Sequence, residues 1–309
     1  MHYDEAEYPY SYRDLPVLPE LLDELEWDVV CLFDACRWDA FEKMCAESEP
    51  VHSTVWHTHE WMSDVVANDE YDWSDVTYIS GNLMTSTVTD TEEFDGAVED
   101  HVRRYEQLYQ GGNDALDDVL GTTRPSEITR KLMLSPWETP IVIHFFQPHN
   151  PFIGNVHLNA STSPRRTEMP LGDPDKMSGE AQLVKEGHVS LEMYRAAYLE
   201  NLKLVWEAKE DIRQKFGKVI TTADHGEILG PEEFGHGHRN NQGGVVPFHT
   251  NWDVELPSPE SVGAAESHEW TTATATNDKH SESESRNSES PTVDQEVEEK
   301  LRALGYQPH

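Results

Sequence analysis

The chain has few basic residues. Of its 309 residues only 23 are Lys or Arg, against 59 Asp and Glu, which gives a formal net charge of −36. Nucleic-acid binding needs clustered basic side chains for phosphate contacts, so this composition argues against a nucleic-acid partner. The acidic surplus suits a protein kept soluble in concentrated salt, where the Debye length falls to about 3 Å at 1 M. We therefore expect a halophilic protein, with an ordinary acidic protein as the alternative.

Cysteines and long apolar runs are also scarce. The three cysteines, Cys31, Cys36 and Cys45, are odd in number and lack the spacing of zinc ligands, so no disulfide framework is expected. No stretch approaches the roughly 20 apolar residues of a membrane span. The first residues lack the basic and apolar regions of a signal peptide. These absences predict no membrane span and a cytoplasmic location.

Short apolar runs and one long amphipathic segment are present instead. Residues 28–33, 76–80, 139–146 and 218–222 are rich in Val, Ile, Thr and Phe, which is typical of parallel strands buried on both faces. Residues 190–216 predict a long helix, because apolar residues recur at three-to-four spacing on one face. That face comprises Leu191, Tyr194, Tyr198, Leu202, Val205 and Ile212. Alternating strands and helices predict an α/β fold, with a mainly parallel sheet sandwiched between helices.

Composition suggests a boundary near residue 256. Residues 1–256 are expected to form one domain, within which the Pro- and Gly-rich segment 154–188 is interpreted as a long loop or lid near a site. Residues 257–292 are dominated by Ser, Thr, Glu and Asn, which predicts a disordered linker. Residues 293–309 regain helical spacing and are expected to form a C-terminal helix.

Polar side chains follow three of the predicted strands where each strand ends. Asp34 follows the first strand, Gln147 and His149 follow the third, and Asp224 and His225 follow the fourth. The carboxyl ends of parallel strands meet at one edge of a sheet, where ligands bind. These residues are therefore expected to lie close together.

Adjacent carboxylate and imidazole groups can reach one divalent cation if the chain turns there, and Gly226 permits such a turn. Asp34 would add a second carboxylate. A cation held this way could polarise a phosphoryl or sulfuryl oxygen and help to deprotonate a hydroxyl nucleophile. The alternative for the pair alone is a strand-end cap with a solvated imidazole. His144 and His188 are interpreted as core or surface residues.

Four motifs, in order, resemble the sulfatase and alkaline phosphatase superfamily. They read VVCLFDACRWDAF, HFFQPHNPF, TTADHGEILG and EEFGHGH, and the closing EEKLRALGY is similar to the C-terminal helix of sulfatase-type chains. The motifs are most similar to those of sulfatase-like proteins of haloarchaea. The resemblance covers about residues 27–250 with that helix added, and it implies an alkaline phosphatase-like fold.

The resemblance also implies metal ligands. Asp34 is similar to the N-terminal ligand of the family, and Asp224 and His225 to its C-terminal pair. The family's paired N-terminal aspartates are absent, because Ala35 follows Asp34, which points to one firmly held metal. Carboxylate, imidazole and hydroxyl ligands suit Zn²⁺, Mn²⁺ or Mg²⁺, and Ca²⁺ less readily.

Further residues match the family around the transferred group. His149 is similar to the histidine that contacts the transferred anion or a second metal, and His236, with His238 as the fallback, to the histidine that follows the aspartate–histidine pair. Arg37 and Asp39 match the N-terminal signature. Arg37 is expected either to bind the substrate anion or to brace its loop.

The family nucleophile lies at a helix N-terminus between the first two strands, where free N–H groups stabilise an anion. The matching segment is 53–66, and Thr58 is the expected nucleophile and a further metal ligand through Oγ, with Ser53 and Thr54 as alternatives. The non-functional interpretation is that Thr58 only caps a helix beginning at His59.

The resemblance therefore implies a metal-dependent hydrolase or transferase acting on a phosphate or sulfate ester of a small molecule or glycan. The Cys-x-Pro-x-Arg and Ser-x-Pro-x-Arg motifs of formylglycine sulfatases are absent, and a threonine nucleophile favours phosphoryl chemistry. Two alternatives remain open. One is a non-catalytic binding domain that retains the metal pocket, and the other is a phosphoglycerol or phosphoethanolamine transferase.

Overall fold

The computed structural model describes most of the first 257 residues. The described ranges are 11–68, 70–85, 98–109, 116–117, 122–156, 158, 179–237 and 239–257. The predicted linker from residue 258 onward, the predicted C-terminal helix and the candidate His238 lie outside these ranges. The domain boundaries near residues 256 and 292 therefore stay predictions.

A seven-stranded sheet forms the centre, in the order β2-β11-β8-β1-β7-β3-β4. Strands β8, β1, β7, β3 and β4 run parallel, whereas β11 is antiparallel to both β8 and β2. The strands are β1 Val29–Asp34, β2 Glu49–His52, β3 Thr77–Ser80, β4 Arg104–Gln107, β7 Ile141–Pro148, β8 Val219–Ala223 and β11 Val245–Thr250. Four strands, β1, β3, β7 and β8, match the predicted apolar runs to within two residues at each end.

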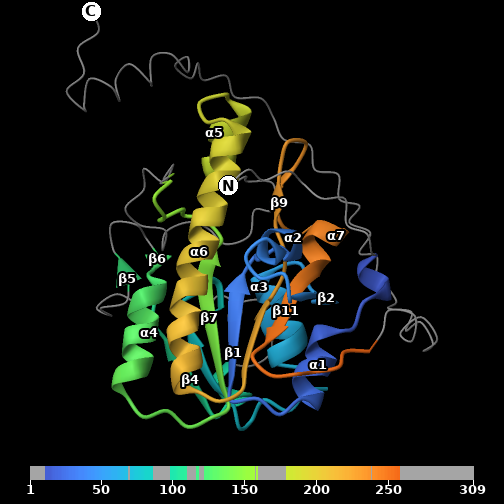
Figure 1. The fold of residues 1–309 in the computed structure, drawn as a ribbon, viewed down its shortest axis with the longest axis vertical. Coiled ribbons are helices and arrows are strands. Elements are labelled where there is room, and N and C mark those ends of the chain that lie inside the picture. Colours follow the sequence, from blue (N-terminus) through green and yellow to red (C-terminus); the bar gives the residue numbers. More distant parts are fainter. Residues whose placement is uncertain are drawn as a thin grey trace, which may run out of the picture. The chain divides into compact units, whose positions relative to one another are not determined.

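Helices cover the sheet, as predicted for this fold class. Helices α4 (Pro125–Leu134) and α6 (Leu191–Lys215) lie side by side in front of β7 (Figure 1). Ser190 caps α6 by accepting a hydrogen bond from the Met193 N–H at 3.1 Å. The predicted apolar face of α6 is buried except at its first residue, Leu191, which is partly buried. The α/β interpretation and the long helix are confirmed.

The remaining elements are short. They are η1 (Tyr12–Asp14), α1 (Leu18–Glu24), α2 (Trp38–Glu42), α3 (Thr58–Glu60), the π-helical segment η2 (Trp61–Val66), η4 (Val98–Asp100), α5 (Gly179–Lys185) and α7 (Asn241–Gly244). Two small hairpin sheets pair β5 (Leu116–Asp117) with β6 (Thr122–Thr123) and β9 (Ile228–Leu229) with β10 (Phe234–Gly235). Helix α5 occupies part of the predicted 154–188 loop, and residues 159–178 of that segment are not described. None of the helices in the described ranges has the length and apolar character that crossing a membrane requires.

Candidate active site

The ends of β1 and β8 bring three of the predicted residues to the hydroxyl of a fourth, Thr58, on α3. Thr58 Oγ1 lies 2.8 Å from Asp224 Oδ2, 3.2 Å from Asp34 Oδ1 and 3.4 Å from His225 Nε2. His225 Nε2 is in turn 3.4 Å from Asp34 Oδ1 and 3.6 Å from Asp224 Oδ2. All four side chains are buried. The predicted convergence of these residues is observed, while their chemical roles stay predictions.

Neighbouring backbone groups fix the Asp224 carboxylate. Asp34 is the last residue of β1, and Ala35 after it adopts a positive φ of 58°, which turns the chain sharply at the sheet edge. The Ala35 N–H donates to Asp224 Oδ1 at 3.2 Å, and the His225 N–H donates to the same oxygen at 2.9 Å. Two backbone donors therefore hold one oxygen of Asp224, and its other oxygen faces Thr58.

Thr58 is the first residue of α3, and His57 occupies the N-cap position. The prediction that Thr58 caps a helix beginning at His59 is therefore wrong. The Thr58 hydroxyl is directed at the aspartates instead. The alternative nucleophiles are engaged elsewhere, because the Ser53 hydroxyl donates to the Val55 carbonyl at 2.8 Å and the Thr54 hydroxyl to the Ser53 carbonyl at 2.6 Å.

The four ligand atoms have the separations of a tetrahedral site. A zinc ion about 2.0 to 2.1 Å from each ligand would place the ligand atoms about 3.3 to 3.4 Å apart. The five separations given above among the Asp34, Thr58, Asp224 and His225 atoms lie between 2.8 and 3.6 Å. These five separations are close to those of a tetrahedral ligand set, so the residues present fit a small divalent cation.

The electrostatics of this group also favour a cation. Burial alone would lower the pKa of His225, but the charges of Asp224 and Asp34 outweigh burial and raise its pKa to about 10. Burial would raise the pKa of Asp224, yet the charge of His225 and hydrogen bonds from His144 and Thr58 hold it well below its usual value. The two buried carboxylates thus stabilise a positive charge beside them. A proton on His225 supplies this charge when no metal is bound.

Gly226 was predicted to permit a turn of the chain, but the structure gives a different reason for a glycine at this position. Its φ is not in the left-handed region, unlike that of Gly230, Gly235 and Gly237. A Cβ at Gly226 would lie only 2.0 Å from the Gln242 carbonyl oxygen, and the Gly226 N–H donates to the Gly243 carbonyl at 2.7 Å. Gly226 therefore allows the 240–244 segment to pack directly against the residues that follow β8.

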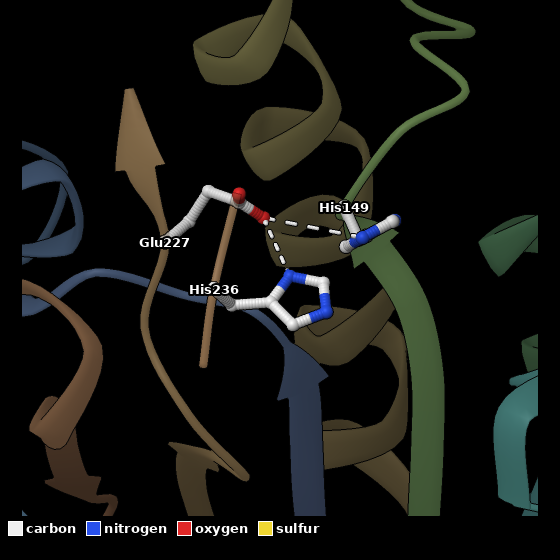
Figure 2. A group of neighbouring side chains, drawn as sticks. All are labelled: His149, Glu227 and His236. Carbon is white, nitrogen blue, oxygen red and sulfur yellow. Dashed lines mark ion pairs between the residues drawn. The ribbon is translucent and has the colours of Figure 1, made fainter. Parts of the chain in front are cut away.

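A second polar group adjoins the first. The imidazoles of His149 and His236 both point at the Glu227 carboxylate (Figure 2), with Glu227 Oε2 4.0 Å from His149 Nε2 and 3.7 Å from His236 Nδ1. The three ligand atoms lie within 4.8 Å of one another. The β9–β10 hairpin brings Glu227 and His236 together, because they flank the paired residues Ile228 and Gly235.

The two groups are in contact through their imidazoles. The ring centroids of His225 and His236 are 4.7 Å apart. Burial would raise the pKa of Glu227, but His236, His149 and His225 outweigh it and lower that pKa. Glu227 therefore remains ionised, and the second group can bind a cation or, with protonated histidines, an anion. Glu227 lies in the Asp-His-Gly-Glu motif, but the sequence suggested no role for it.

Of the two roles expected for Arg37, its contacts match the one in which it braces its own loop. Its guanidinium is buried, with Nε 2.8 Å from Asp39 Oδ1, Nη2 2.9 Å from Asp39 Oδ2, and Nη1 donating to the Glu227 carbonyl at 3.1 Å. Such a paired fork is rigid. Arg37 thus ties the segment after β1 to Glu227, and its predicted substrate-binding role is the less favoured alternative.

The comparisons with known proteins give distant likenesses only. No family model and no curated protein matches the sequence. The C-terminal periplasmic domain of a phosphoethanolamine transferase from Campylobacter jejuni is 13% identical, covers 77% of this chain and 83% of its own, and has a TM-score of 0.42. The soluble domain of a lipooligosaccharide phosphoethanolamine transferase from Neisseria meningitidis is 13% identical over 76% of this chain and 81% of its own, with a TM-score of 0.44.

A phosphonate monoester hydrolase of Agrobacterium radiobacter is 13% identical over 77% of this chain and 69% of its own, with a TM-score of 0.40. At such identities and TM-scores, these similarities are too weak to place the chain in a family or to assign it an activity.

Proposed function

We propose that this protein is a metal-dependent hydrolase or transferase of phosphate or sulfate esters, with an alkaline phosphatase-like site. The observation that carries the proposal is the position of the Thr58 hydroxyl, within 3.4 Å of Asp34, Asp224 and His225. A buried hydroxyl among two carboxylates and an imidazole is the arrangement of an activated nucleophile beside a cation.

The cation would be held by Asp34, Thr58, Asp224 and His225. When bound, it would supply positive charge that lowers the pKa of the Thr58 hydroxyl and polarises the ester. The Thr58 hydroxyl directs its hydrogen at Asp224 Oδ2, 2.8 Å away, and would release this proton to solvent when the cation is held there. Thr58 Oγ then attacks the phosphorus or sulfur atom as the ester oxygen leaves on the opposite side.

The second group is suited to the leaving side of the reaction. His149 Nδ1 donates to the Asn150 carbonyl at 2.7 Å, so His149 can donate to an anionic oxygen through Nε2 when the ring carries both protons. The Glu227 carboxylate lies 4.0 Å from His149 Nε2 and 3.7 Å from His236 Nδ1. His236 would give a proton to the departing alcohol, and His149 would hold a non-bridging oxygen. If a second cation binds instead, the same three residues are its ligands. Water or another alcohol completes the transfer.

Model-ester turnover tests the proposal. p-Nitrophenyl phosphate and p-nitrophenyl sulfate would be assayed with Zn²⁺, Mn²⁺ or Mg²⁺ at high salt, for wild type, Thr58→Ala, Thr58→Ser and Asp224→Ala. Loss of the nucleophile or of a metal ligand is expected to lower turnover by on the order of 10⁴-fold or more. Thr58→Ser, which keeps a hydroxyl, is expected to retain measurable activity.

Thr54→Ala is the matched control, because the Thr54 hydroxyl bonds to its own neighbour rather than to the site. Full activity in Thr58→Ala would show that another group is the nucleophile. Metal binding without turnover of any ester would favour the binding-domain alternative. Added alcohols that divert product from free phosphate would identify a transferase.

A further inference from the structure

His144 lies under the four-residue group, on the same face of the sheet. In the strand register, His144 of β7 aligns with Leu32 of β1, and Leu32 aligns with Thr222 of β8. Side chains two residues apart on a strand point to the same face. Asp34 and Asp224 lie two residues beyond Leu32 and Thr222 in the chain, although the β1–β7 register shifts between Phe33 and Asp34. The His144 ring is fully buried.

The hydrogen bonds of His144 determine which ring nitrogen carries the proton. Nε2 lies 3.3 Å from Asp224 Oδ2, and Nδ1 lies 2.8 Å from the Tyr78 hydroxyl. An ionised carboxylate only accepts hydrogen bonds, so Nε2 must carry a hydrogen directed at Asp224. Nδ1 then accepts from the Tyr78 hydroxyl. A protonated Nε2 has no lone pair for a metal, although it lies within 4.8 Å of oxygens of both aspartates.

Asn82 fits the same assignment. Its Nδ2 lies 3.4 Å from His144 Nε2 and 3.4 Å from Thr58 Oγ1. Two N–H groups do not bond to one another, so Asn82 donates to the Thr58 oxygen instead. The Thr58 hydroxyl can then direct its own hydrogen at Asp224.

We propose that His144 is a positioning residue, whose tautomer Tyr78 fixes and whose Nε2–H holds Asp224 Oδ2 in place to bind the cation. This inference rests on the proposed function. Backbone N–H groups already hold Asp224 Oδ1, so His144 supplies the restraint on the oxygen that faces Thr58. Hydrogen-bond partners behind metal ligands typically contribute about 10- to 100-fold to metal affinity.

Cobalt titration tests the inference without relying on turnover. The dissociation constant for Co²⁺ and its visible absorption spectrum would be measured for wild type, His144→Leu, His144→Gln and Tyr78→Phe. His144→Leu is expected to weaken binding by about 10- to 100-fold. His144→Gln keeps an N–H donor near Asp224 and is expected to recover most of that loss with an unchanged spectrum. Tyr78→Phe, a nearly isosteric change, should fall between wild type and His144→Leu.

His52→Leu is the matched control, because His52 lies on β2 of the same sheet and packs on Tyr12, and it should bind Co²⁺ like wild type. If wild type binds no Co²⁺, the proposed function and this inference both fail. If wild type binds but His144→Leu and Tyr78→Phe bind equally well, only the inference is overturned. A changed Co²⁺ spectrum in His144→Gln, with affinity as low as in His144→Leu, would make His144 a ligand and would also overturn it.

Discussion

At the residue scale, the site is governed by two buried carboxylates that require a compensating positive charge. A proton on His225 provides that charge in the metal-free protein, where its pKa is raised to about 10. This raised pKa means that the stabilisation from the charged imidazole is full below the ordinary histidine pKa. The stabilisation is lost as pH rises toward 10.

Metal binding should therefore release a proton. A metal ligand must be a neutral imidazole, so His225 loses about one proton per metal bound between roughly pH 7 and 9. Apparent metal affinity should rise about tenfold per pH unit in this window and level off above about pH 10. Calorimetric titrations in buffers of different ionisation enthalpy measure the proton count directly. Heats that do not depend on the buffer at pH 8 would rule out a charged His225 in the metal-free site.

Much of the site was predictable because its residues follow the ends of strands. The direction of a side chain within a strand was not predictable from the sequence. Asp34, Asp224 and His225 each follow an apolar run and stood out for that reason. His144 lies inside such a run, and only the register of β7 with β1 shows that it faces Asp224. Its place in the sequence gave no signal of that contact.

At the element scale, strand character was predictable where apolar residues were continuous. β11 and β2 were not predicted, because each contains a proline, and Pro247 aligns with Pro50 where the two strands pair. Prolines are confined mostly to edge strands. β2 is an edge strand, and Pro247 of β11 precedes His249 and Thr250, the residues that pair with β8. The β9–β10 hairpin was likewise unpredicted, because its strands have two residues each.

The loop after β8 depends on close backbone approach at Gly226. Gly226→Ala would place a Cβ 2.0 Å from the Gln242 carbonyl, so the 240–244 segment must move. We expect a loss of about 1 to 3 kcal/mol in unfolding free energy, measured by urea denaturation. Gly217→Ala is the control, because its Cβ would meet only the side chain of Asp28, with Oδ2 at 2.7 Å. Equal stability of both variants would refute this explanation of Gly226.

At the scale of the whole molecule, the net charge of −36 predicts strong self-repulsion in dilute buffer. The unfolding free energy at pH 7, measured with urea, should therefore rise as KCl is increased from about 0.1 to 1 M, where screening becomes nearly complete. The same titration near the isoelectric pH of about 4.6 is the control, because there the repulsion is largely removed. Stability that is flat or falling with salt at pH 7 would contradict a salt-adapted protein.

The central claim is that segments far apart in the sequence meet around Thr58 to hold one cation. Anomalous diffraction at the zinc edge, from crystals grown with Zn²⁺, tests it most directly. We predict a peak about 2.0 to 2.1 Å from ligand atoms of Asp34, Thr58, Asp224 and His225. A map with no peak among these four side chains, at saturating zinc, would contradict it.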